Sequence, residues 1–117
     1  ILLLLHFLHH SPMIERELGS KITEWSKQYP VVTITGPRQS GKTTLAKTLF
    51  ADKYYVSLED LDNRSFAKAD PRGFISENRE GAVIDEIQHA PELVSYLQTE
   101  VDRDDEAGRF ILTGSQQ

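Results

Sequence analysis

The sequence predicts an α/β fold in which a mostly parallel sheet is covered by helices on both faces. Three observations point to this class: short apolar runs that suit buried strands, helical segments between those runs, and a glycine-rich turn that joins the first clear strand to a helix. The 117 residues are enough for one small domain with a modest core.

The elements follow one another in a regular order. Apolar residues at helical spacing after Met13 predict an amphipathic helix, and β-rich runs bounded by polar residues predict short strands. Asp70 and Pro71 suit the N-cap and first turn of a helix. The expected strands are 31–35, 54–58, the run 82–84 leading into Asp85, and 109–113; the expected helices are 13–28, 42–51, 62–69, 71–78 and one that begins at Pro91.

Residues 1–12 differ from the rest of the chain. Ile1 to Leu8 is almost wholly apolar, too short to span a membrane, and lacks the basic start of a signal peptide. We expect residues 1–12 to be a leader or upstream sequence outside the fold, with Met13 as the natural start. The expected domain is then 13–117, the N-terminal part of a longer protein, with an incomplete sheet of about four strands.

Residues 36–43 match the pattern G-x-x-x-x-G-K-[ST], which is the phosphate-binding P-loop. An apolar strand precedes this loop and a helix follows it, as the motif requires. Loop N–H groups and the helix N-terminus would cradle phosphates, Lys42 would reach the β- and γ-phosphates, and the Thr43 hydroxyl would bind Mg²⁺. The expected nucleotide-binding set is Gly36, Pro37, Arg38, Gln39, Ser40, Gly41, Lys42, Thr43 and Thr44.

A second acidic motif follows a later strand. The apolar run 82–84 ends in Asp85-Glu86, at the carboxyl end of a buried strand, where ligands bind in open α/β sheets. Asp85 would hold Mg²⁺, through a water, and Glu86 would activate the attacking water. The plain alternative is that both acids simply begin a solvated loop.

The last apolar run also ends in small polar residues. In ATPases with an extra strand between the two motif strands, a polar side chain here senses the γ-phosphate. Ser115 is the first choice for this role, ahead of Thr113 and Gln116, and ordinary turn residues are an equal alternative. The predicted catalytic residues are therefore Glu86, Lys42 and Ser115.

Composition narrows the function classes. The formal net charge is −5, which argues against a general nucleic-acid binder. Because the chain has no cysteine, it can form no disulfide, zinc-thiolate site or cysteine nucleophile, and a cytoplasmic location is expected.

These motifs together resemble the prokaryotic AAA-type ATPases whose ATPase core precedes a C-terminal domain of unknown function. The resemblance rests on the P-loop, on Asp-Pro-Arg-Gly-Phe at 70–74, on Val-Ile-Asp-Glu-Ile-Gln at 83–88 and on Leu-Thr-Gly-Ser-Gln at 112–116. It implies a three-layer AAA-like core, ATP and Mg²⁺ as cofactors, a protein partner or C-terminal domain, and a possible homo-oligomer. This chain lacks a fifth predicted strand, a helical lid and a recognisable arginine finger.

Three functions are compatible with the motifs. The first is Mg-dependent ATP hydrolysis that drives a conformational change in a longer protein. The second is a nucleotide-binding switch with negligible turnover. The third is a small-molecule kinase, which the acid at Glu86 disfavours because it suits activation of water.

Overall fold

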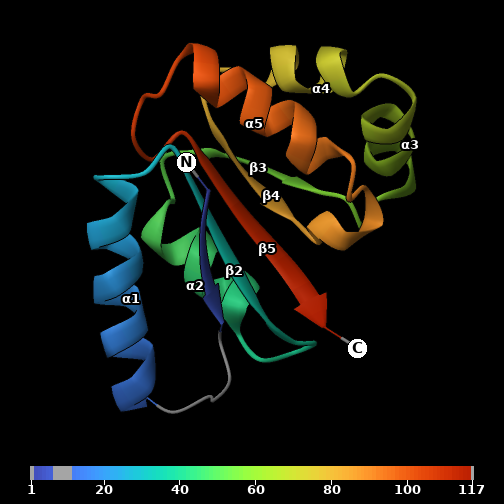
Figure 1. The fold of residues 1–117 in the computed structure, drawn as a ribbon. Coiled ribbons are helices and arrows are strands. Elements are labelled where there is room, and N and C mark those ends of the chain that lie inside the picture. Colours follow the sequence, from blue (N-terminus) through green and yellow to red (C-terminus); the bar gives the residue numbers. More distant parts are fainter. Residues whose placement is uncertain (1, 7–11, 117) are drawn as a thin grey trace.

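The computed structural model describes residues 2–6 and 12–116 and contains one parallel sheet with helices on both faces (Figure 1). The strand order is β1-β2-β5-β4-β3, and every neighbouring pair is parallel. The α/β, three-layer class predicted from the sequence is therefore confirmed. The strands are β1 (Leu2–His6), β2 (Val31–Pro37), β3 (Tyr54–Ser57), β4 (Ala82–Asp85) and β5 (Phe110–Gln116).

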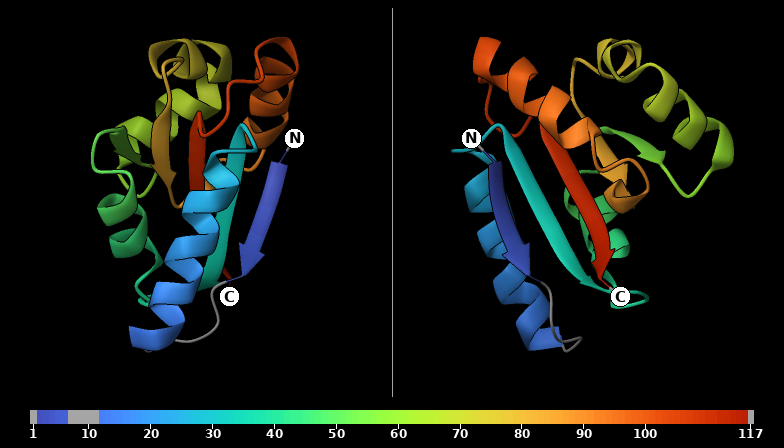
Figure 2. Two further views of the ribbon diagram at one scale, coloured as in Figure 1. Left: turned by 90° about the vertical axis from the view of Figure 1, so that its left-hand side faces the viewer. Right: turned by 45° about the vertical axis from the view of Figure 1, so that its right-hand side comes forward.

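The helices divide into two groups, one on each face of the sheet (Figures 1 and 2). On one face lie α1 (Pro12–Ser26) and α2 (Lys42–Leu49); the other face carries α3 (Leu61–Ala69), α4 (Pro71–Glu77) and α5 (Leu93–Arg103). A short 3₁₀ turn, η1 (Ile87–His89), joins β4 to α5. None of the described helices is long and apolar enough to cross a membrane.

The two-residue period of the strands divides the core into two layers. Alternate residues of β2, β4 and β5 pack toward α1 and α2, and the residues between them pack toward α3, α4 and α5. The first layer contains Ile22, Val32, Ile34, Ala46, Val83 and Ile111; the second contains Val31, Phe74, Ile84, Leu97, Phe110 and Leu112.

The position of β5 matters most for the site, because this strand lies between β2 and β4. Gly36 of β2 pairs with Ser115, and Ile84 of β4 pairs with Leu112. Parallel strands bring their carboxyl ends to one edge of the sheet, so the P-loop, Asp85 and the polar end of β5 meet there.

The structure differs from the sequence expectation at residues 2–6. Instead of lying outside the fold, this segment forms β1 and pairs in parallel with β2, from Leu2 beside Val31 to His6 beside Thr35. The physical reason is that β2 would otherwise present an open edge of backbone N–H and C=O groups, which an apolar segment can cover by pairing. Pro12, also expected in the leader, is the first residue of α1, and residues 1 and 7–11 lie outside the described residues.

Several element boundaries also differ by a few residues, and two of them bear on the site. Strand β5 continues to Gln116, beyond the expected end at Thr113, because its pairing with β2 runs through Gly36 and Pro37. The last helix begins at Leu93, two residues after Pro91, because η1 takes up the chain after Glu86.

Candidate functional site

The loop from β2 to α2 has the backbone shape of an anion cradle. Gln39 and Gly41 both adopt positive φ, at 61° and 92°, and Gly41 precedes the first residue of α2. Alternation of left-handed and right-handed residues turns successive N–H groups toward one concavity, and the first N–H groups of a helix have no intrahelical acceptor. The loop therefore presents donors and the positive end of α2 to the same point.

Lys42, the first residue of α2, is almost fully buried, with 2% of its surface exposed. Its ammonium Nζ donates to the Pro37 carbonyl at 3.1 Å and to Ser115 Oγ at 3.0 Å. These two contacts hold the side chain back over its own loop. A buried cation that touches both the P-loop and β5 is suitably placed to meet an anion in the cradle.

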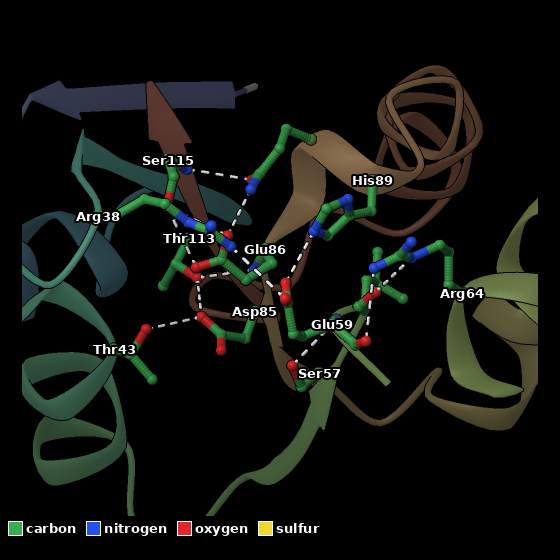
Figure 3. Close-up of polar contacts among 12 residues, drawn as sticks. Arg38, Thr43, Ser57, Glu59, Arg64, Asp85, Glu86, His89, Thr113 and Ser115 are labelled. Atoms are coloured by element: carbon green, nitrogen blue, oxygen red, sulfur yellow. Dashed lines mark hydrogen bonds and ion pairs between the residues drawn. The ribbon is translucent and has the colours of Figure 1, made fainter. Parts of the chain in front are cut away.

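Glu86 lies immediately beyond β4 and points back toward β5 (Figure 3). Ser115 Oγ lies 3.2 and 3.1 Å from its two carboxylate oxygens, and Gln88 Nε2 donates to the same carboxylate. Gln88 also accepts from the Ser115 backbone N–H at 3.1 Å. The three residues predicted to be catalytic, Lys42, Ser115 and Glu86, therefore form one continuous chain of contacts.

Asp85, the last residue of β4, is buried with 5% of its surface exposed, and hydroxyl groups from three elements surround it. Thr43 donates to Oδ1 at 2.8 Å, Thr113 also donates to Oδ1, and Tyr55 donates to Oδ2 at 2.6 Å. Burial raises the pKa of Tyr55 to about 12, and the hydrogen bond to Asp85 acts in the same direction. The phenol therefore keeps its proton and acts as a donor.

Sequence reasoning missed two of these partners. It gave Tyr55 no role, and it used Gln88 only as part of the motif at 83–88, without a role of its own. The Tyr55 contact depends on strand register: Ser57 pairs with Asp85, which brings the β3 face carrying Tyr55 alongside the carboxylate. The Gln88 contacts depend instead on the η1 turn after β4. The signal available in the sequence was the two-residue period that places Tyr55 and Ser57 on the same face of β3.

A second polar group links the P-loop to the β3–α3 connection (Figure 3). Glu59 contacts His89 Nε2 at 2.8 Å and Arg38 Nη2 at 3.5 Å. The hydrogen bond from His89 lowers the pKa of Glu59. Potential metal-ligand atoms of Glu59, Glu86 and His89 lie within 4.8 Å of one another. However, Glu59 and His89 already form a hydrogen bond with each other. The neighbouring acid Asp60 caps α3 instead, accepting from the N–H groups of Asp62 and Asn63.

Of the predicted nucleotide-binding residues, 39–44 line a hollow of about 250 Å³, and Gly36, Pro37 and Arg38 are not in its lining. Gly36 and Pro37 belong to the end of β2, and Arg38 is exposed. The donor set fits a phosphate chain, and the Thr43–Asp85 pair supplies the hard oxygen atoms that Mg²⁺ prefers. Residues lining the hollow are Gln39, Ser40, Gly41, Lys42, Thr43, Thr44 and Glu86.

Larger hollows lie away from these residues. One of about 620 Å³ lies between α4 and α5 and includes Arg72, Arg79 and Arg103. Another of about 850 Å³ lies between α1 and α2. Size alone does not assign chemistry, and the smaller hollow is the one where the loop, the buried Lys42 and the acid Glu86 meet.

The fold is that of a P-loop NTPase-like core, and the family comparison indicates a nucleotide-binding domain. A family model described as an AAA domain matches residues 28–117, and the chain belongs to that family.

Two curated relatives are similar to the chain: an uncharacterized protein of Mycobacterium bovis, Mb2031c, and an uncharacterized protein of Mycobacterium tuberculosis, Rv2008c. Each is 34% identical over 102 residues, which is 86% of this chain and 23% of the relative. The chain thus spans about a quarter of the length of these relatives. No solved structure matches the chain significantly.

Proposed function

We propose that the chain binds ATP with Mg²⁺ and forms the hydrolytic core of a longer AAA-type ATPase. The observation that supports this most directly is the convergence of both motifs on β5. Lys42 and Glu86 share Ser115, while Thr43 and Asp85 contact each other directly. The two parts of the proposed Mg-ATP site, the P-loop and the acids after β4, are therefore joined directly by a hydrogen bond.

Each residue has a distinct proposed role. The loop N–H groups and Lys42 bind the β- and γ-phosphates, and Thr43 with Asp85 holds Mg²⁺, Asp85 through a water. Mg²⁺ held there neutralises charge on the phosphates. Glu86 orients a water and accepts its proton, and Ser115 places Glu86 relative to the γ-phosphate.

A nucleotide-binding switch is the second candidate, and one observation favours it. Both Glu86 oxygens are engaged by Ser115, and Gln88 donates to the same carboxylate. A carboxylate held in this way has fewer acceptor positions free for a water, and turnover then requires these contacts to open.

The broader expectations belong to the same proposal. We propose a cytoplasmic location and action on a protein partner or C-terminal domain, with assembly into a homo-oligomer. A nucleic-acid partner has no support from the net charge of −5.

Nucleotide binding and phosphate release test the proposal on the same purified protein. We expect Lys42→Ala to abolish binding of fluorescent ATP, and Glu86→Gln to retain ATP while phosphate release stops. Lys68→Ala and Glu77→Gln, at exposed positions of α3 and α4, are the matched controls. Normal ATP affinity in Lys42→Ala refutes the phosphate site. Unchanged turnover in Glu86→Gln refutes the role of that acid.

A further inference from the structure

Tyr55 is the one aromatic hydroxyl that the described residues place directly on Asp85. Its oxygen lies 2.6 Å from Asp85 Oδ2, and this contact joins β3 to the end of β4. The residue is partly exposed at 39%, so burial of the ring alone does not explain its position. Its neighbour Tyr54 is 69% exposed, and the strand period places it on the opposite face of β3.

The hydroxyl groups around Asp85 divide its two oxygens between them. Oδ1 accepts from Thr43 and Thr113, whereas Oδ2 accepts from Tyr55. An ionised carboxylate has about four acceptor positions. With three of them used by fixed donors, rotation of the carboxylate is restricted and one acceptor position is left for a further ligand.

The tyrosine ring is itself held from the P-loop side. Lys47 Nζ of α2 lies 4.2 Å from the centre of the Tyr55 ring, close enough for a cation–π interaction. Lys47 is four residues after Thr43, so both project from the same face of α2. The helix that carries Thr43 thus contacts Asp85 twice, directly through Thr43 and indirectly through Lys47 and Tyr55.

We propose that Tyr55 is a positioning residue for the metal site, which acts by fixing the orientation of Asp85 through Oδ2. This inference rests on the proposed function, because it concerns the same Mg²⁺ site. In this role the Tyr55 hydroxyl acts through Asp85 and would not itself bind nucleotide or metal. It sets the direction in which the remaining acceptor position of Asp85 points, and therefore the Mg²⁺ concentration at which the site fills.

The test is Tyr55→Phe, which removes the hydroxyl and keeps the ring against Lys47. Binding of fluorescent ADP is measured without metal and across a MgCl₂ titration. We expect metal-free affinity to be unchanged and the half-saturating Mg²⁺ concentration to rise about tenfold, the lower end of the loss when a partner of a metal ligand is removed. Tyr54→Phe removes the neighbouring hydroxyl on the other face and should leave both quantities unchanged.

A second comparison separates orientation of Asp85 from general stability. In an Asp85→Asn background, Tyr55→Phe should no longer shift the Mg²⁺ titration, because the carboxylate it orients is gone. A tenfold shift that persists in that background overturns the proposal. So does an unshifted Mg²⁺ titration in Tyr55→Phe while the wild-type protein responds to Mg²⁺. If the wild-type protein binds no ADP at all, the proposed function fails first, and this inference fails with it.

Discussion

Replacement of Thr113 by valine tests how β5 holds the two acids of β4. The Thr113 side chain is fully buried, its hydroxyl donates to Asp85, and it accepts from the Glu86 backbone N–H at 3.1 Å. Valine has nearly the same shape but can make neither bond. The loss of a hydrogen bond to a charged group costs about 1.5–3 kcal/mol, so we expect Thr113→Val to lower the free energy of unfolding by about 2–3 kcal/mol.

Thr113→Ser is the matched variant, because it keeps the hydroxyl and removes one buried methyl group. The lost methyl costs about 0.5–1.5 kcal/mol, on the scale of Ile→Val changes in cores. The ranking should therefore be wild type, serine, then valine, read from urea unfolding midpoints at constant slope. If the serine variant is as unstable as the valine variant, packing of the methyl group dominates and the reasoning about the hydroxyl is wrong.

Two further predictions use other features of the fold. Gly81 has φ of +113°, and a Cβ there would lie 2.5 Å from the Arg109 carbonyl oxygen. Gly81→Ala should therefore destabilise the protein by about 1–3 kcal/mol. Gly19→Ala in α1, where the nearest atom to the added Cβ is 3.7 Å away, should be neutral or stabilise the protein by up to about 1 kcal/mol. Thermal unfolding of both variants checks this, and equal losses would contradict it. For pH, the folded pKa of Tyr55 is about 12 against an ordinary 10.0, so the unfolded chain releases this proton first. The contribution of the Tyr55 hydroxyl to folding stability is complete below pH 10 and is lost toward pH 12. Urea unfolding midpoints should therefore fall less steeply with pH over that range in Tyr55→Phe than in the wild type. Parallel plots of midpoint against pH for the two proteins would refute the raised pKa of Tyr55.

Local spacing was enough to predict the P-loop and most of the elements. The motif at 36–43 is defined by its own backbone and by the helix that follows, so no long-range information is needed to find it. The buried strands were also readable, because strands covered on both faces have continuous apolar runs. What the sequence did not contain directly was the register between strands, which decides that Tyr55 faces Asp85.

The conformation of the turn after β4 could not be predicted from the sequence, for a different reason. Glu86 adopts φ of 61°, a conformation that non-glycine residues rarely take, and η1 follows it at once. Nothing in the residue types at 86–89 signals this shape. It is stabilised from β5, where Thr113 accepts the Glu86 N–H, and from Gln88, which donates to the Glu86 carboxylate.

The insertion of β5 between the two motif strands accounts for how the site is connected. Thr113 and Ser115 are two residues apart, so both project from the same face of the strand. Thr113 contacts Asp85 and the backbone of Glu86, while Ser115 contacts the Glu86 side chain and Lys42. If β2 and β4 were direct neighbours, neither hydroxyl would lie between the lysine and the acids. One face of β5 therefore contacts Lys42 and both acids, and Ser115 links Lys42 directly to the Glu86 carboxylate.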